Sequence, residues 1–489
     1  MTPKRPHADP TPIDQQSLQL TRRGVLTGAA VAGAASIAAA SPALGAAGRR
    51  RKTKPHTTAA YASHYPALPD PASSGIEHIV VVCMENRSFD HYLGWLPGAD
   101  GRQAGLVYKD DAGKPHATHH LLERQGCGFA DPDHSYEGGR TQLNGGAMDG
   151  FRRGSNDDFA LGYYTAADLP LYAPLLDVAS TYDRYFASIL APTYPNRFYT
   201  HAAATDRLSN TSTTSTLPTL WDRLDAAGVP STYYFSDAPF LALWGTKHLS
   251  KSRPVEQFFV DALAGNLTPY TYIDPSFLGE GQGGTYDDHP HADILRGQSF
   301  LSSVVRAITH SPKWTSTVLV ITYDEWGGFF DHVRPPRLPD DHDTGPAGKD
   351  DHAQAGFRVP TIVVSPFARR GHVGHNVYDH ASIVRMVRWR FGLAPLTKRD
   401  ANVRNLAESL DFVTPHFGIP ETPLVGDPGP HLCQPPLGTT VPTGGPVMGL
   451  EDPFWRDLTA MIAQDRSLRA WEDVMRPAPT LPKLQSYVA

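Results

Sequence analysis

Two stretches of the sequence end an apolar run with a cluster of acidic and amide side chains. In IVVVCMENRSFDH the run leads to Glu85 and Asn86, and in VLVITYDEWGGFFDH a similar run leads to Asp324 and Glu325. If both runs are parallel strands of one sheet, their carboxyl ends meet at the edge where α/β proteins bind ligands. The alternative is that each cluster only ends a strand in a polar turn.

An ion between the two clusters would relieve the repulsion between their carboxylates. Carboxylate and amide oxygens are the ligands that hard divalent cations such as calcium, magnesium and manganese prefer. Gly327 and Gly328 follow the second cluster and would let the backbone turn tightly or approach a ligand. We therefore expect one divalent metal ion, of undetermined identity, at this edge.

A third stretch, ILAPTYPNRFYTHAAAT, contains a hydroxyl suited to nucleophilic chemistry. Thr193 lies two residues before Pro195, and proline is favoured in the first turn of a helix. Thr193 is therefore expected at a helix N-terminus, where backbone N–H groups suit an anionic phosphate. A hydroxyl that faces a carboxylate-held metal can become an alkoxide nucleophile. The alternative is that Thr193 only caps the helix.

The elements that must position these residues follow an α/β pattern. Apolar runs at 79–83, 231–236, 318–323 and 359–365 are expected to be strands covered on both faces, as in a parallel sheet. Helical spacing of apolar residues occurs at 169–186, 219–228, 294–311 and 379–392. In the last helix, Asp379 is a natural N-cap and Gly392 a natural stop. The alternation predicts one three-layer α/β sandwich with a mostly parallel central sheet.

Composition and the N-terminus bound the class of protein. The 489 residues carry a formal net charge of -6, with 40% hydrophobic and 19% charged residues. These values are typical of a folded soluble protein and give no general reason to expect nucleic-acid binding. Residues 1–45, with Arg22-Arg23 before a stretch rich in Ala and Gly, resemble a twin-arginine export signal. The alternative is a membrane anchor, but the stretch has too few strongly apolar residues.

Three further segments complete the expected organisation. Residues 46–73 are basic and then rich in Pro, Ala and Ser, and they predict a flexible linker. Residues 74–489 are expected to form a single catalytic domain with a Pro/Gly-rich C-terminal extension, about 395–489. We expect an exported protein, secreted or associated with the cell surface, that engages the twin-arginine machinery and has no transmembrane segment once mature.

The three cysteines allow one disulfide at most. Cys83 lies in an apolar run and is expected to be a buried free thiol. Cys127 and Cys433 lie in loop-like surroundings, so a bridge between them is allowed, although the sequence does not establish it.

Four motifs, in order along the chain, resemble those of the bacterial phospholipase C and acid phosphatase phosphoesterase family. They are ENRSFDHYLG, PTYPNR, DEWGGFFDHVRPP and RVPTIVVSPFARRGHVGHNVYDHASIVR, and the resemblance runs over about residues 76–393. The family belongs to the alkaline phosphatase-like superfamily, whose fold the resemblance implies here. Family members often have histidine after the acidic pair, where this chain has Trp326, so a role for that side chain is in doubt.

The resemblance also implies roles for individual residues. The metal ligands would be Glu85, Asn86, Thr193, Asp324 and Glu325, with Thr193 also the nucleophile. The catalytic histidines would be His134, His289, His332 and His380. The function implied is that of a secreted metal-dependent phospholipase C, which cleaves the glycerol-side phosphoester of phospholipids through a phospho-threonine intermediate. The alternatives are an acid phosphatase that acts on phosphomonoesters and, in another class, a non-catalytic secreted metal-binding protein.

Overall fold

A computed structural model of the chain describes residues 64–279, 283–345, 350–433 and 477–489, together with residues 463, 471 and 474. The expected export signal, most of the expected linker and part of the expected C-terminal extension lie outside these residues. Residues 64–73 of the expected linker contact the domain, because the Tyr65 hydroxyl is hydrogen-bonded to His372 Nε2 at 3.0 Å. Among the described residues, every helix is too short or too polar to cross a bilayer.

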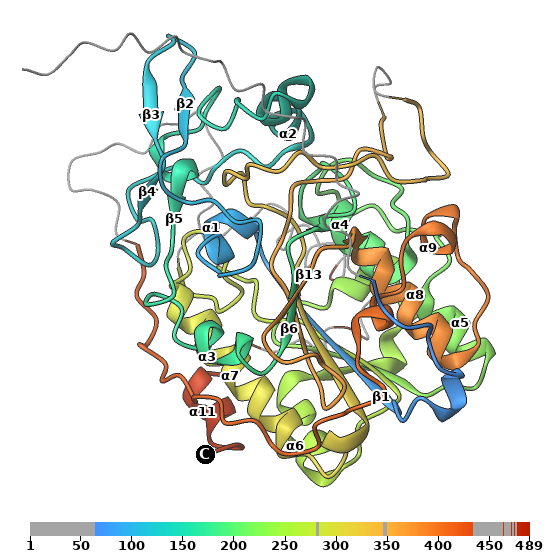
Figure 1. Cartoon of the computed structure of the whole chain (residues 1–489). Coiled ribbons are helices and arrows are strands. Elements are labelled where there is room, and N and C mark those ends of the chain that lie inside the picture. Colours follow the sequence, from blue (N-terminus) through green and yellow to red (C-terminus); the bar gives the residue numbers. More distant parts are fainter. Residues whose placement is uncertain are drawn as a thin grey trace, which may run out of the picture. The chain divides into compact units, whose positions relative to one another are not determined.

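An eight-stranded sheet forms the centre of the domain (Figure 1). Its order is β13 (His372–Gly374), β6 (Ser180–Tyr182), β12 (Thr361–Val364), β11 (Thr317–Tyr323), β1 (His78–Met84), β10 (Tyr270–Ile273), β8 (Ser231–Phe235) and β9 (Ser252–Pro254). All strands are parallel except β12, which is antiparallel to both neighbours. The expected mostly parallel sheet is confirmed, although the sequence pattern at 359–365 could not show the reversed direction.

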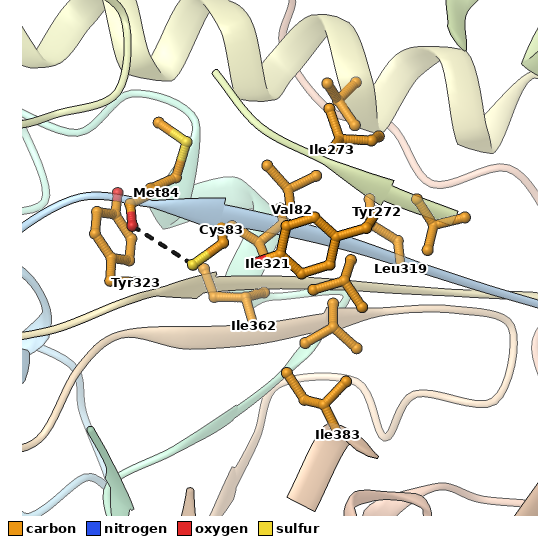
Figure 2. Close-up of a cluster of buried hydrophobic side chains, with 14 of the residues drawn as sticks. Val82, Cys83, Met84, Tyr272, Ile273, Leu319, Ile321, Tyr323, Ile362 and Ile383 are labelled. Carbon is orange, nitrogen blue, oxygen red and sulfur yellow. Dashed lines mark hydrogen bonds between the residues drawn. The ribbon is translucent and has the colours of Figure 1, made fainter. Parts of the chain in front are cut away.

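The two central strands are β1 and β11, and every residue of both is buried. They pair in parallel from His78↔Thr317 to Met84↔Tyr323, so they end at the same level. Figure 2 shows their apolar side chains packed with those of β10 and β12. Because Val and Ile fill both faces of these strands, a central position in the sheet is the one that buries them fully.

Helices form a layer on each side of the sheet. One group comprises α6 (Val255–Ala264), α7 (Ile294–Thr309) and α11 (Leu481–Gln485), and the other α4 (Thr193–Ala202), α5 (Leu220–Ala226), α8 (His380–Phe391) and α9 (Lys398–Asn402). Figure 1 shows α6, α7 and α11 at the lower left and the second group at the right. Helix α8 begins at the Asp379 capping box and ends at Gly392, as expected. The three-layer α/β class is confirmed.

A long insertion separates β1 from β6 and carries short elements. These are α1 (Phe89–Leu93), β2 (Val107–Lys109), β3 (Pro115–Ala117), β4 (His119–His120), α2 (Tyr136–Leu143), β5 (Gly162–Tyr163) and α3 (Tyr172–Leu176). A small parallel pair, β7 (Tyr185–Phe186) with β14 (Tyr378–Asp379), links the next segment to the start of α8. Short 3₁₀ helices occupy Pro71–Ser73, Asn144–Gly146, Asp158–Leu161, Phe240–Trp244, Leu249–Lys251, Trp314–Ser316 and Leu406–Ser409.

The prediction of a helix over 169–186 is wrong for most of that range. Only α3 is helical there, and β6 and β7 follow it. The segment STYDRYF is rich in β-branched and aromatic residues, which favour strands once a sheet edge is available. Pairing of β6 with β12 and β13 therefore overrides the helical spacing.

A disulfide joins Cys127 to Cys433 and ties the insertion to the C-terminal segment. Cys83 is a buried free thiol. The sequence allowed this pairing, and the structure contains it.

Candidate active site

The ends of β1 and β11 are joined by backbone hydrogen bonds beyond the strands themselves. Asp324 N donates to the Met84 carbonyl at 3.0 Å, and Arg87 N donates to the Glu325 carbonyl at 3.0 Å. Asn86 N also donates to Asp324 Oδ1 at 3.1 Å. The two acidic clusters expected at the edge of the sheet are therefore in direct contact, and neither is an isolated polar turn.

Two glycines permit this approach. A Cβ atom on Gly327 would lie 2.1 Å from the Asn86 carbonyl oxygen, and one on Gly328 would lie 2.6 Å from Pro132 Cβ. Both glycines also have positive φ, at 62° and 72°, a region that other residues rarely adopt. The pair therefore lets the acidic turn pack against both the first motif and the loop before α2.

Thr193 lies in the first turn of α4, and its side chain faces the acidic cluster. Its Oγ1 donates a hydrogen bond to Glu85 Oε2 at 3.2 Å. The N-cap position belongs to Pro192, and no side chain caps the helix. The threonine hydroxyl thus contacts a carboxylate rather than the free amides of α4, which argues against a purely capping role.

Arg197 lies one turn further along α4 and was not among the expected site residues. It is 1% exposed, and its guanidinium bonds Glu85 Oε1 through Nε at 2.8 Å and Asp274 Oδ1 through Nη1 at 2.7 Å. Its Nε is also 3.5 Å from Asp324 Oδ2. Two signals could have identified these residues: Arg197 is four positions after Thr193 on one helix, and Asp274 directly follows β10.

Three buried oxygens of this network lack a hydrogen-bond partner among the described residues. They are Asn86 Oδ1, Glu325 Oε1 and Asp324 Oδ2, of which the last is in ion-pair contact with Arg197 at 3.5 Å. Burial raises the pKa of Glu85 and of Glu325 well above the usual range of carboxyl groups. Arg197 contacts three buried carboxylates, those of Glu85, Asp274 and Asp324, and Glu325 adds a fourth buried carboxyl group next to Asp324. A cation beside these oxygens would compensate both the charge and the missing hydrogen bonds. The residues present therefore fit an oxygen-ligated divalent ion.

His134 and His289 lie beside this group on the insertion side. His134 Nε2 is 3.3 Å from Asn86 Nδ2 and 4.0 Å from Glu325 Oε1. The rings of His134 and His289 are 5.9 Å apart, and Asp131 lies between them at 3.9 Å from the first and 3.8 Å from the second. Asp131 was not expected at the site, although it lies three residues before His134 in the sequence.

The other two expected histidines have different surroundings. His380 Nε2 donates to the Asp324 backbone carbonyl at 2.6 Å, so it supports the acidic turn from behind. His332 Nδ1 lies 2.5 Å from Asp90 and its Nε2 lies 3.1 Å from Asp100. Burial alone would lower the pKa of His332, but hydrogen bonds to these two carboxylates raise it to about 9.

His332 therefore belongs to a second cluster, and its expected catalytic role stays a prediction. Asp90 and Asp331 also share the buried Arg358, at 3.0 Å each. Both nitrogens of His332 are occupied by carboxylates in this cluster. Its contacts connect α1, the loop after β11 and the residues before β12, which is the arrangement of a structural ion-pair network.

Trp326 is engaged in packing. Its indole Nε1 donates to Gln142 Oε1 at 2.6 Å, and its ring contacts Phe357 with centroids 5.2 Å apart. Trp326, which stands where family members often have histidine, thus anchors α2 against the acidic turn.

The model of the Phosphoesterase family matches residues 76–394, about the same range as the four motifs. The chain belongs to the Phosphoesterase family. It is 32% identical to non-specific phospholipase C6 of Arabidopsis thaliana over 71% of this chain and 74% of that protein. It is 30% identical to phospholipase C B of Mycobacterium tuberculosis over 72% and 81%.

Among solved structures, a Vibrio parahaemolyticus protein of the alkaline phosphatase superfamily aligns at 10% identity and a TM-score of 0.33, over 68% of this chain and 70% of that one. The family and the relatives establish that this phosphoesterase is a hydrolase of phosphoester bonds.

We predict that a divalent cation stabilises the native protein through the unpartnered oxygens. An ion at about 100 times its Kd should stabilise the fold by about 2.7 kcal/mol, measured as a shift in thermal unfolding. Asp324→Asn should remove this shift, because it replaces a charged ligand. Asp411→Asn, in a loop elsewhere, is the control and should keep it. An equal shift in Asp324→Asn would show that the ion binds elsewhere.

Proposed function

We propose that this phosphoesterase is a secreted metal-dependent phospholipase C that cleaves the glycerol-side phosphoester of phospholipids. The observation that carries the proposal is the contact between the Thr193 hydroxyl and Glu85, beside three unpartnered buried oxygens. One divalent ion would be held by Glu85, Asn86, Thr193, Asp324 and Glu325. When bound, it would supply positive charge to the phosphoryl oxygens and favour the ionised form of a coordinated hydroxyl.

The chain's own residues prepare Thr193 for attack on phosphorus. Glu85 Oε2 accepts the hydrogen bond of the hydroxyl and so orients the Oγ1 lone pairs away from itself. Arg197 fixes that carboxylate from the opposite side. Attack would pass the Thr193 proton to Glu85, form a phospho-threonine and break the bond to the diacylglycerol oxygen, which would take its proton from one of the expected catalytic histidines. Water would then cleave the phospho-threonine and release the phosphorylated head group.

The helix N-terminus contributes less than the sequence pattern implies. The backbone N–H of Tyr194 donates to Asn210 Oδ1 at 3.0 Å, so this amide is already engaged. Charge on the phosphoryl group would therefore be stabilised mainly by the ion and the polar side chains around it.

The distribution of positive charge supports a diester substrate. A monoester dianion calls for an additional cation at its third terminal oxygen. Arg197 is occupied by Glu85 and Asp274, and Arg87 is fully buried and bonds the Asp288 carbonyl at 2.7 Å and His91 at 3.0 Å. Neither guanidinium is directed to a substrate, so a singly charged diester suits the site better than a phosphomonoester.

The relatives point in the same direction. The proteins named above are phospholipases C, and this chain covers about three quarters of their length. Aromatic residues that could face a choline ammonium are less informative, because Trp326 packs against Phe357 and the Tyr136 ring lies 3.1 Å from Arg140. We therefore propose the substrate class and leave the head group unassigned.

We predict that Thr193→Val lowers kcat/KM by about 10³-fold or more, because the nucleophilic oxygen is lost while the shape is kept. Thr193→Ser is the matched control and should retain measurable turnover. The assay is hydrolysis of p-nitrophenyl phosphorylcholine in the presence of divalent cation. Near-normal activity of Thr193→Val would show that water, and not Thr193, attacks phosphorus.

A second prediction concerns the class of substrate, phosphodiester or phosphomonoester. kcat/KM for phosphatidylcholine, or for p-nitrophenyl phosphorylcholine, should exceed that for p-nitrophenyl phosphate by about tenfold or more, because the site lacks a spare cation for a dianion. The comparison should be made from pH 5 to 8. The reverse preference would identify an acid phosphatase, and no turnover of either class would identify a metal-binding protein without catalysis.

Export is proposed from the N-terminal sequence. Arg22-Arg23 before a weakly apolar stretch suggests translocation of the folded protein by the twin-arginine machinery, with the mature chain beginning near residue 46. Replacement of both arginines by lysine should retain the protein in the cytoplasm, measured by fractionation and immunoblotting. Unchanged export of the double variant would reject this route.

A further inference from the structure

We propose that one face of the protein, beside the candidate active site, docks on the surface of a zwitterionic phospholipid bilayer. Four exposed apolar side chains lie in the loops of this face and are called the apolar rim: Leu122 (88%), Phe129 (41%), Leu278 (41%) and Leu432 (48%). Single exposed apolar residues are normal in folded proteins, but a group of them on one face marks an interaction surface. The inference rests on the proposed function, because it names the surface that would present the substrate.

The apolar rim borders a cavity of about 450 Å³. Leu122 lines this cavity, and so do Cys127 and His431. Phe129 follows Cys127 by two residues, and Leu432 directly follows His431. The rim and the cavity are therefore one feature of the surface, built from two segments that are distant in the sequence.

Leu278 joins the group through two glycines. The backbone N–H of Gly284 donates to the Gly279 carbonyl at 3.4 Å, which closes the loop that Leu278 precedes. A Cβ atom on Gly284 would lie 3.6 Å from Leu432 Cδ2, so the leucine packs on this loop. Leu278 and Leu432 thus belong to contacting segments.

Covalent and hydrogen bonds hold these segments in place. The Cys127–Cys433 disulfide joins the insertion to the C-terminal segment. Gln125 Nε2 donates to the carbonyls of His291 at 3.2 Å and His431 at 2.5 Å. The apolar side chains are thus presented by loops that are already ordered, which lowers the entropic cost of docking.

The same loops lead into the candidate active site. His291 Nε2 donates to the Phe129 carbonyl at 3.0 Å. His289 lies two residues before His291, and Asp131 lies two residues after Phe129, and these two side chains are 3.8 Å apart. A bilayer in contact with the apolar rim would therefore bring phospholipid head groups to the loops that carry the site residues.

The charges of the cavity favour a zwitterionic surface. Arg124 lies 3.8 Å from Asp293, and Glu123 lines the same cavity. A phosphocholine head group carries one negative and one positive charge, so a surface that offers both signs is complementary to it. Anionic lipids attract clusters of basic residues, and this face has no such cluster among its described residues. Burial of apolar side chains is therefore the expected source of affinity.

The chain supplies a matched control surface at the other end of α7. Val413 and Ile419 are 80% and 55% exposed. Ile419 lines a separate cavity with Arg306, which lies in the last turn of α7, whereas the apolar rim lies near its first turn. A helix of 16 residues is about 24 Å long, so the control pair is remote from the rim.

The test is sedimentation of the purified full chain with sucrose-loaded vesicles of phosphatidylcholine. Leu122→Ser/Leu432→Ser should lower the vesicle partition coefficient about tenfold or more, because apolar burial supplies the affinity. Val413→Ser/Ile419→Ser should bind as the wild type does. Equal binding by wild type and Leu122→Ser/Leu432→Ser would overturn the proposal, as would wild-type binding that requires phosphatidylserine or no wild-type binding at all.

Turnover of two substrates separates docking from catalysis. Leu122→Ser/Leu432→Ser should hydrolyse soluble p-nitrophenyl phosphorylcholine at the wild-type rate, whereas its hydrolysis of phosphatidylcholine in vesicles should fall with vesicle binding. Equal loss of both activities would show that these side chains support the catalytic site and would reject the docking role. A wild type that binds vesicles but hydrolyses neither substrate would reject the proposed function and support the docking face.

A second measurement does not depend on loss of binding. Leu122→Trp places a fluorophore on the apolar rim, and brominated phosphatidylcholine vesicles should quench its added emission. Val413→Trp is the control and should show no quenching of the added emission. Equal quenching of the two variants would overturn the assignment of this face.

Discussion

Arg197 holds three carboxylates that the sheet brings to one edge, and the geometry of the site depends on this contact. Its guanidinium bonds Glu85 and Asp274 and approaches Asp324, so it joins the ends of β1, β10 and β11 to α4. An unpaired buried charge is costly, and removal of one partner from such a network typically costs about 3–5 kcal/mol. Thr193 and Arg197 lie on the same helix, α4. The network therefore couples the position of Thr193 to the position of the acidic turn that Arg197 contacts.

The same arrangement divides the cluster into two faces. Arg197 satisfies the oxygens on the side of α4 and β10, whereas the unpartnered oxygens of Asn86 and Glu325 face the insertion. Burial first, and the neighbouring Asp324 carboxylate second, raise the pKa of Glu85 and of Glu325, although Arg197 opposes the rise for Glu85. The protein thus maintains a local deficit of positive charge at the position proposed for the divalent ion, at some expense in stability.

Much of this site could be predicted from sequence because it follows from the ends of strands. The apolar runs before Glu85 and Asp324 are long, β-branched and followed by polar residues, so both strand type and strand end were recognisable. The caps of α8 at Asp379 and Gly392 were recognisable for a similar reason, since capping depends on local chemistry. These features need no knowledge of partners distant in the sequence.

The features that sequence could not supply are those decided by distant contacts. The direction of β12 depends on which neighbours it joins, and the 169–186 segment becomes largely strand because β12 and β13 are available to pair with it. Arg197 and Asp274 meet across 77 positions, and neither carries a local signal as strong as an acidic pair. His332 is the opposite case, because it has a strong local signal in a family-like motif. Its surroundings, formed by Asp90, Asp100 and Arg358, could not be predicted from that motif.

The insertion between β1 and β6 brings a histidine to the acidic edge of the sheet, where His134 Nε2 lies 3.3 Å from Asn86 Nδ2. Gly328 lets Pro132 pack directly on the acidic turn, and this contact places the Asp131–His134 loop beside Glu325. A larger residue at Gly328 would separate the loop from the turn, and His134 would then lie further from Glu325. The proximity of His134 to the acidic turn is therefore a property of the Gly-Gly turn as much as of the polar residues, and the chemistry of the edge depends on a position that has no functional side chain of its own.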